Sequence, residues 1–397
     1  MATLISIREA PRPGQPAAFA LWALGFRPFY LLSSAFAALS VGLWALQFNG
    51  MLPHAYLQGP LWHAHEMLFG FCLAVVVGFL FTAGRNWSGQ ATPTGRWLAA
   101  LCVLWLAGRV LVVTPWGWAA MVVTTAFPLC AALGLGLALY RGRNQRNYFF
   151  VGLLLLMALA ELSVHLGALG VLQLPPWAGI GLALDMMLFV LCVMAGRVVP
   201  MFTNNGVRGA RAVRGPRLDR LALGLVLALL VADAMQLGGT PLGLLLVSAA
   251  AAHLVRWLRW QPWKTLGAPL VWVLHLAYVW IPVHLLLRAG AAWGCVPASA
   301  AIHALTVGAI GAMVMGMVTR TALGHTGRVL KAGRTEVVCY VLVALAAVVR
   351  VAWPLLAPAQ LAHAALWSAC LWSGGFGLYA VRYWPVLTRA RIDALPG

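Results

Sequence analysis

Residues 65–89 read HEMLFGFCLAVVVGFLFTAGRNWSG, an apolar run that starts at a histidine and a glutamate and ends in a polar, glycine-terminated exit. The run is long enough to cross a bilayer, because about 20 helical residues span the hydrocarbon core. It therefore predicts a transmembrane helix. Ionisable side chains are costly in lipid. The three ionisable residues at the start of this helix therefore mark a candidate functional site; they are His63, His65 and Glu66.

Runs of this kind recur along the whole chain. Of the 397 residues, 62% are hydrophobic and 9% are charged, whereas a soluble domain carries about 25% charged residues. We therefore predict an all-α polytopic membrane protein with twelve transmembrane helices in one domain over residues 19–385, between tails at 1–18 and 386–397. The expected spans lie near residues 20–46, 61–82, 96–113, 116–140, 147–169, 176–199, 218–236, 240–258, 267–289, 297–319, 336–356 and 359–383.

Positive charge is distributed unevenly between the two sides of the predicted domain. Lys and Arg gather at both termini and in the loops that follow even-numbered spans, and the exceptions Arg109, Arg288 and Arg350 sit at span ends. Because cytoplasmic loops carry the excess of Lys and Arg, both termini are predicted to be cytoplasmic. The net charge of +19 then reflects membrane topology, and nucleic acid is not an expected partner.

A weak internal repeat relates the second and tenth spans. When residues 65–89 are aligned with HALTVGAIGAMVMGMVTRTALGHTG at 303–327, His65 falls on His303. The sixth span ends in a similar exit, GRVVPMFTNNG at 196–206. The second, sixth and tenth spans are four helices apart, so a true repeat would divide the twelve spans into three units of four helices. The alternative is that the aligned glycines coincide by chance, because glycine is common in this chain. The aligned glycines are Gly70 with Gly308, Gly78 with Gly316, and Gly89 with Gly327.

Most histidines fall in one half of the predicted membrane domain. At a rise of 1.5 Å per residue, the periplasmic half or its surface holds His54, His63, His65, His165, His284, His303 and His363. His275 lies near the midplane, and His253 and His325 lie towards the cytoplasm. Neutral imidazole binds haem iron, copper and zinc, and axial haem histidines come from facing helices at matching height. His65 and His303 match in height; the alternative is that single histidines only join helices by hydrogen bonds.

The spacing of the first two histidines has a geometric consequence. On a helix, His63 and His65 point about 200° apart, so they would serve two different sites. Glu66 shares a face with His63, where it would orient that imidazole or carry protons. The alternative is that the Glu66 carboxylate caps the helix start.

Other ionisable residues are expected inside the spans, and these are Arg27, Glu161, Asp185, Arg197 and Asp233. Asp185 is mid-span and therefore the most costly of them. Arg27 or Arg197 would either neutralise Asp185 or pair with the propionates of a bound haem. The seven cysteines form no CxxC or CxxCH motif, which argues against thiolate zinc sites and covalently attached haem.

Several segments together resemble the NnrS family of membrane proteins. They are GFRPFYLL at 25–32, WHAHEMLFGF at 62–71, GFLFTAGRNWSG at 78–89, GRVVPMFTNNG at 196–206, HLAYVWIP at 275–282 and HALTVGAIGAMVMGMVTRTALGHTGR at 303–328. That family is described as haem- and copper-containing proteins of the bacterial nitric oxide response, associated with denitrification and nitrosative stress. The resemblance implies an inner-membrane protein that binds copper and a b-type haem and takes nitric oxide as its ligand or substrate.

The resemblance also implies functional residues. Glu66 is the expected catalytic residue, and metals in the periplasmic half are expected on histidines of spans 2, 9 and 10. Residues expected to contact haem are His65, His303, His63, Arg27 and Arg197. Residues expected to bind metal are His63, His65, His275, His303, His284 and His325; of these, His284 lies outside the resembling segments.

The predicted plan is also similar, more distantly, to the catalytic subunit of haem–copper oxidases and nitric oxide reductases. Twelve spans, cytoplasmic termini, a threefold arrangement of four-helix units and histidines on spans 2 and 10 are shared with it. The departure is that its copper or non-haem iron ligands come from spans 6 and 7, which here contain no histidine. Any second metal must therefore use other ligands.

The sequence leaves open whether the protein is an enzyme. A nitric oxide reductase-like oxidoreductase would need an electron donor, which the sequence does not identify, and protons arriving near Glu66 or through Asp185. One alternative is a twelve-helix secondary transporter, for which Asp185 and Glu161 would bind protons or substrate. Another is a non-catalytic metal-binding or assembly partner.

Overall fold

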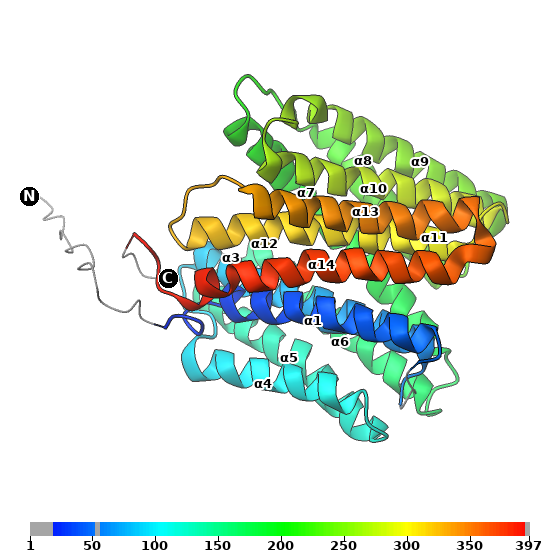
Figure 1. The fold of residues 1–397 in the computed structure, drawn as a ribbon, viewed down its shortest axis with the longest axis horizontal. Helices are drawn as coiled ribbons and strands as arrows, with labels where there is room; N and C mark the ends of the chain where they lie inside the picture. The colour runs from blue at the N-terminus through cyan, green and yellow to red at the C-terminus, as the bar shows by residue number, and fades with distance from the viewer. Residues whose placement is uncertain (1–18, 52–55, 394–397) are drawn as a thin grey trace, which may run out of the picture.

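The computed structural model describes residues 19–51 and 56–393, which form a bundle of helices without a strand in this part of the chain (Figure 1). The predicted N-terminal tail and His54 lie outside the described residues, as do residues 394–397. Each of the twelve predicted segments contains a helix or a helical run. The fold class is therefore confirmed as all-α.

The first seven segments have these bounds: α1 (Phe26–Phe48), the run α2 (Gly59–His65), η1 (Glu66–Cys72) and α3 (Leu73–Ser88), α4 (Gly95–Leu111), α5 (Gly117–Arg141), α6 (Phe149–Ala168), α7 (Pro176–Gly206) and α8 (Pro216–Ala234). The remaining five are α9 (Gly239–Leu258), α10 (Pro269–Ala292), the run α11 (Ala298–His303), η4 (Ala304–Gly311) and α12 (Ala312–His325), α13 (Arg334–Leu356) and α14 (Leu361–Thr388). Short 3₁₀ turns precede three of the helices: η2 (Gln145–Asn147), η3 (Pro262–Thr265) and η5 (Pro358–Gln360).

Ten of these helices or runs, within the described residues, are long and apolar enough to cross a membrane. The other two are α4 and α8. Helix α4 has 17 residues and so is about 25 Å long, slightly less than a hydrocarbon core of about 30 Å. Helix α8 carries Arg217, Asp219, Arg220 and Asp233. The structure therefore supports a multi-pass membrane protein, and the count of twelve spans with cytoplasmic termini stays a prediction.

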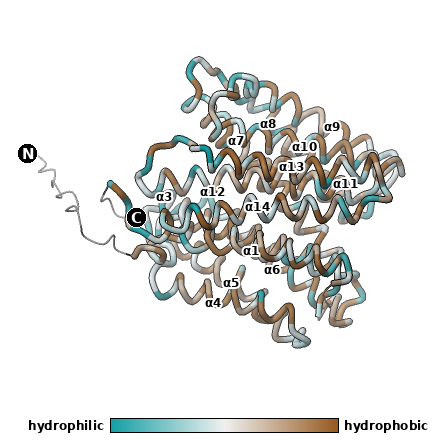
Figure 2. Tube along the Cα trace, viewed as in Figure 1, coloured by the Kyte–Doolittle hydropathy of each residue, from teal (hydrophilic) through white to brown (hydrophobic). Residues whose placement is uncertain are grey.

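The surface of the bundle is suited to lipid. Figure 2 shows hydrophobic residues along the helices and many hydrophilic residues in the loops at their ends. Large apolar side chains face outward, among them Leu39, Val103 and Leu133, each more than 60% exposed. Since burial in lipid removes apolar surface from water, this exposure is expected of membrane helices.

In chain order the helices can be grouped into the three units of four that the repeat predicts. The first unit holds α1, the α2–α3 run, α4 and α5; the second holds α6 to α9; the third holds α10, the α11–α12 run, α13 and α14. Each unit's last helix packs against the first helix of another: α5 against α6, α9 against α10, and α14 against α1. Figure 1 shows α1 and α14 side by side, although they lie at opposite ends of the chain. These contacts join the units in the order that a threefold arrangement requires.

Two π-helical segments occupy equivalent places in the first and third units. Segment η1 begins directly after His65, and segment η4 begins directly after His303. These are the two histidines that coincide in the internal repeat. A π-helix widens the turn and occurs frequently at functional sites.

The aligned glycines of the repeat also have matching structural roles. A Cβ on Gly70 would lie 2.7 Å from Phe36 of α1, and one on Gly308 would lie 2.5 Å from Trp280 of α10. Gly78 and Gly316 likewise approach α1 and α10, the first helices of their units.

The third aligned glycine pair, Gly89 and Gly327, lies just after the C-terminal ends of the two helical runs. Gly89 and Gly327 both adopt positive φ, at 66° and 74°, a conformation that glycine adopts readily. Shared roles at three aligned pairs favour a true repeat over chance coincidence.

Candidate metal centre

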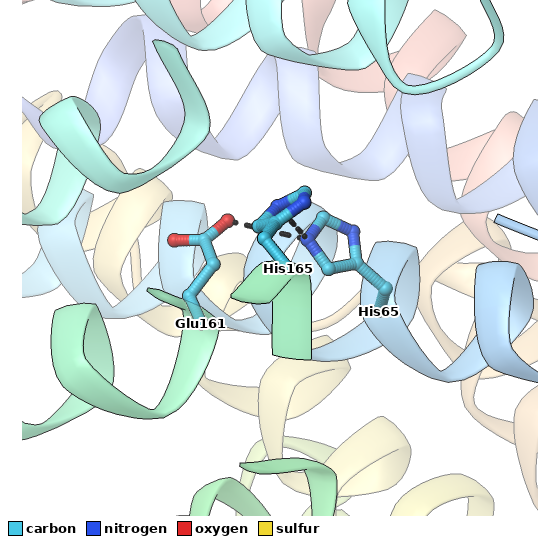
Figure 3. Close-up of side chains that lie close together, drawn as sticks. All are labelled: His65, Glu161 and His165. Carbon is cyan, nitrogen blue, oxygen red and sulfur yellow. Dashed lines mark hydrogen bonds and ion pairs between the residues drawn. The ribbon is translucent and has the colours of Figure 1, made fainter. Parts of the chain in front are cut away.

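Three buried side chains from two helices converge in the first half of the chain. His65 lies at the end of α2, and Glu161 and His165 lie one turn apart on α6, where an i, i+4 spacing puts both on one face. One ligand atom from each lies within 4.8 Å of the others, and Figure 3 shows the three side chains directed towards one another. All three residues are fully shielded from solvent.

The distances within this cluster match the coordination of one small metal ion. His65 Nε2 lies 3.1 Å from His165 Nε2 and 3.5 Å from Glu161 Oε1. Two ligands of a tetrahedral ion with bonds of about 2.0 Å are separated by about 3.3 Å. Two of the three donor separations therefore match those around such an ion, and the third lies within 4.8 Å. Two imidazoles and a carboxylate form a donor set suited to copper, zinc or iron.

Glu66 forms a hydrogen bond with the ring nitrogen of His65 that does not face Glu161 and His165. His65 Nδ1 donates a hydrogen bond of 2.8 Å to Glu66 Oε1, which leaves the Nε2 lone pair directed at Glu161 and His165. A carboxylate in this position orients a metal-binding imidazole and raises its basicity. The prediction that Glu66 would orient His63 is wrong, because its carboxylate accepts the proton of His65 instead.

Arg109 of α4 pairs with both carboxylates of the cluster. Its Nη1 donates to Glu66 Oε1 at 2.6 Å, and its Nη2 lies 3.9 Å from Glu161 Oε1. One guanidinium against two carboxylates leaves one negative charge in excess while both imidazoles are neutral. Both Glu161 oxygens have no hydrogen-bond partner among the described residues. A buried site with carboxylate oxygens that lack hydrogen bonds and with an excess of negative charge favours a bound cation.

His165 is positioned by two hydroxyl groups. Its Nε2 lies 2.9 Å from Thr124 Oγ1, and its Nδ1 lies 3.2 Å from the Tyr56 hydroxyl. Burial raises the pKa of Tyr56 to about 12, so the phenol keeps its proton at neutral pH. It can accept the Nδ1 proton of His165 while donating to that residue's carbonyl oxygen, which is 3.5 Å away. His165 Nε2 then carries the lone pair of the ring, which lies beside Thr124 Oγ1 and His65 Nε2.

His63 and His65 serve different surroundings, as their spacing predicts. The ring of His63 stacks on Trp44 of α1, with ring centroids 4.2 Å apart. The other predicted metal-binding histidines lie outside the cluster. His284 Nδ1 donates to the carbonyl of Ala301 at 2.8 Å, and its buried Nε2 has no partner. His303 Nδ1 donates to the carbonyl of Ser299 at 2.6 Å.

His275 and His325 each lie in a separate environment. His275 Nε2 is 2.8 Å from Thr203 Oγ1, and its Nδ1 is buried without a partner. His325 ends α12 and packs against the ring of Phe26, with centroids 5.6 Å apart. The predicted ligands are therefore spread over several places, and only His65 belongs to the three-residue cluster.

The two predicted haem-contacting arginines have local partners. Arg27 donates to the carbonyls of Leu387 and Arg389 at the end of α14, and Arg197 lies over the ring of Phe149. The suggestion that one of them neutralises Asp185 is wrong, because Arg288 of α10 takes this role at 3.5 Å.

Five residues of the site were not among the predicted site residues: Tyr56, Arg109, Thr124, Glu161 and His165. The segment ELSVH at 161–165 carried a usable signal, because a carboxylate and an imidazole four residues apart share a helix face. Arg109 and Thr124 gave no comparable signal in the sequence, because an arginine at the end of a span and a threonine inside a span are both common.

The structure offers a limited fit for haem. An apolar groove of about 560 Å³ lies beside α1, α4 and α14, and its lining residues include no histidine that could bind haem iron. His284 has the better donor chemistry: its Nδ1 proton is held by a carbonyl, and its buried Nε2 lacks a partner. Axial and metal-binding imidazoles are commonly oriented in this way.

Comparison with known families gives one result. The family model described as NnrS protein matches residues 20–391. No curated protein gives a significant match.

Proposed function

Because the chain belongs to the NnrS family, we propose that it is a membrane protein of the nitric oxide response that binds a redox metal ion between His65, Glu161 and His165. The observation that carries the proposal is the 3.1 Å separation of the two imidazole Nε2 atoms in a fully buried site. Two imidazole lone pairs this close repel each other unless a proton or a metal ion lies between them. The excess negative charge of the cluster favours the metal.

Copper is the proposed metal. Imidazole is a good ligand for copper, and affinity at nitrogen and oxygen sites is highest for Cu²⁺ among the divalent first-row ions. His65, Glu161 and His165 would hold the ion, which when bound would supply a redox-active centre for nitric oxide. The side chains of this site hold and tune the ion: Glu66 orients His65, Arg109 balances the carboxylates, and Tyr56 and Thr124 hold His165.

Haem is the second proposed cofactor, and His284 is its proposed ligand. The support is the buried Nε2 of His284, which lacks a partner, together with the hydrogen bond that fixes its Nδ1 proton. Haem bound here would be of the b type, since the chain has no CxxCH motif.

Reduction of two nitric oxide molecules to N₂O and water consumes two electrons and two protons. Glu161 could hold a proton beside the metal, because both its oxygens are buried and neither accepts a hydrogen bond from the described residues. Glu66 has one such oxygen, Oε2. These carboxylates give the proposed site a local proton reserve, while the electron donor would be a separate protein or small molecule.

The test is metal analysis of the purified full-length protein beside matched variants. We expect about one copper per chain in the wild type, with an EPR spectrum of nitrogen ligation, and loss of copper in His65→Ala and His165→Ala. His363→Ala is the control, because His363 is an exposed histidine outside the cluster. Retention of stoichiometric copper in both cluster variants would refute the site.

Nitric oxide handling needs a separate measurement. An electrode that follows nitric oxide in solution, with an artificial electron donor, distinguishes consumption from binding alone. Steady consumption that disappears in His165→Ala supports an enzyme. Metal-bound protein that neither binds nor consumes nitric oxide contradicts the proposed function and leaves a metal-binding or assembly role.

A further inference from the structure

The apolar groove beside α1, α4 and α14 lies where the two ends of the chain meet, since α1 and α14 pack against each other. Figure 1 shows α14, α1 and α4 in succession on one face of the bundle. Among the described residues, the lining includes no charged, hydroxyl, amide or imidazole side chain. Val103 and Val381 of its walls are exposed. In a membrane the groove therefore opens to lipid, and its surface fits hydrocarbon.

The groove runs inward from the end of the bundle where α4 begins and α14 ends. Trp22 and Trp384 line it near that end. Leu106, another lining residue, lies about 16 Å further along α4 than Gly95, at a rise of 1.5 Å per residue. Indole rings are enriched at the interface between membrane and water. The groove therefore starts at the level of the interface and continues into the hydrocarbon layer, as the acyl chain of a lipid does.

The first turn of α4 brings an arginine to this end of the groove. Gly95 N donates a hydrogen bond of 2.8 Å to the carbonyl oxygen of Trp22, a lining residue. Arg96 follows Gly95 directly, and both Arg96 and Trp97 are exposed. An exposed arginine beside interfacial indoles lies at the level of the phosphate groups of a bilayer.

A second arginine reaches the same segment from the end of α14. Ala20 N donates to the carbonyl oxygen of Thr388 at 2.7 Å. Arg389, which follows Thr388, therefore lies beside the chain that leads into Trp22. Arg27 Nη1 fixes this position by donating to the carbonyl oxygen of Arg389 at 2.8 Å. The side chain of Arg389 itself is exposed.

No carboxylate balances these two charges within residues 19–51 and 56–393. Neither Arg96 nor Arg389 belongs to an ion pair in this part of the chain. Asp393 is close to Arg389 in the sequence, but its carboxylate pairs with Arg391 at 2.6 Å. Positive charge at the mouth of an apolar groove is complementary to a molecule with an anionic head and a hydrocarbon tail.

We propose that this groove binds an anionic phospholipid, with one acyl chain between α1, α4 and α14 and the phosphate beside Arg96 and Arg389. The lipid chain covers apolar surface at the contact of α1 with α14, which joins the first and third units. A quinone fits the groove less well, because its ring needs hydrogen-bond donors and the lining is apolar apart from two indoles and one thiol.

The test is native mass spectrometry of the full-length protein in an uncharged detergent. Dioleoyl phosphatidylglycerol and dioleoyl phosphatidylcholine are the probes, because they share their acyl chains and differ in net charge. We expect saturable binding of one phosphatidylglycerol, at least about tenfold tighter than that of phosphatidylcholine, since each arginine near the membrane surface favours anionic lipid. Equal affinity for the two lipids would overturn the proposal.

Two double variants separate the groove from the general positive charge of the protein. Arg96→Gln with Arg389→Gln should bind phosphatidylglycerol at least about tenfold more weakly than the wild type does. Arg208→Gln with Arg211→Gln removes two exposed arginines of the loop after α7, so it changes the net charge equally and should bind as the wild type does. An equal loss in both double variants would contradict the proposal, because the lipid would then respond to total charge.

Val103→Trp tests the apolar part of the site, because the larger ring fills the groove. Val122→Trp on α5 is the matched control: the two valines are 64% and 61% exposed, and Val122 does not line the groove. Without added lipid the two variants should melt alike, and only Val103→Trp should lose the tightly bound phosphatidylglycerol.

Two further results would refute the lipid site. One is full phosphatidylglycerol binding in Val103→Trp, and the other is a short-chain ubiquinone that displaces the lipid from the wild type, which would give the groove to a quinone. The groove shares no residue with the His65 cluster. Copper content should therefore be the same in all these variants, so this test succeeds or fails independently of the proposed metal centre.

Discussion

His65 Nε2 lies 3.1 Å from His165 Nε2, although 100 positions separate the two residues in the chain. The contact joins the second helical run of the first unit to the first helix of the second unit. It is supported from both sides, by Glu66 behind His65 and by Tyr56 and Thr124 around His165.

Glu66→Gln should weaken metal binding while leaving the fold intact. Glutamine can still accept the His65 proton, but it lacks the charge that raises the basicity of that imidazole. We expect a loss of about 10- to 100-fold in copper affinity, measured by competition with a chromogenic chelator. His363→Ala serves as the unaffected comparison, and unchanged affinity in Glu66→Gln would show that Glu66 does not tune the ligand.

Arg109→Gln should destabilise the metal-free protein. The substitution leaves Glu66 and Glu161 as two buried carboxylates without a compensating charge, which costs about 3–5 kcal/mol. Added copper should restore much of the melting temperature, because a bound cation replaces the lost guanidinium charge. The control Arg208→Gln removes an exposed arginine and should not destabilise the protein, and destabilisation of equal size in both variants would contradict the role of the Arg109 charge.

Gly70→Ala and Gly308→Ala should both destabilise the fold. A Cβ at Gly70 would lie 2.7 Å from Phe36, and one at Gly308 would lie 2.5 Å from Trp280. Overpacking of this kind costs about 1–3 kcal/mol. Gly152→Ala on α6 is the matched control, since nothing lies within 4 Å of its added Cβ, and it should be neutral or stabilising by up to about 1 kcal/mol. Melting curves of the three variants measure these differences in stability.

Arg288→Met should destabilise the protein through the charges it leaves behind. Asp185 and Asp233 would face each other without their shared partner, at a cost of about 1–3 kcal/mol because all three groups are partly exposed. Adding Asp185→Asn and Asp233→Asn should recover most of the loss, since contacting residues couple strongly. Failure of the triple variant to recover would mean that Arg288 acts through packing instead of charge.

Much of the helix plan could be predicted because it depends on local composition. Apolar runs of about 20 residues mark spans wherever they occur, and the predicted span near 267–289 agrees with α10 to within a few residues at each end. The repeat was readable for a similar reason. Glycines such as Gly70 and Gly308 recur because each helix must approach its neighbour closely at that point.

The site was harder to predict because it depends on which helices meet. The height of His65 in the membrane could be read from its place in a span, and height alone suggested His303 as its partner. The structure instead brings His165 to His65, because the first unit packs its second helical run against the second unit. Helices at equal depth have several candidate neighbours, and depth does not choose among them.

The composition and the distribution of charge along the chain thus determine that this protein is a helical membrane protein, and its sequence motifs determine its family. Both are properties of the sequence alone and do not depend on which residues are neighbours in space. The pairing of His65 with His165 and the pairing of Arg109 with Glu66 emerge only when the helices pack together. They depend on contacts between residues far apart in the chain, and such contacts are set by the complementarity of whole helix faces.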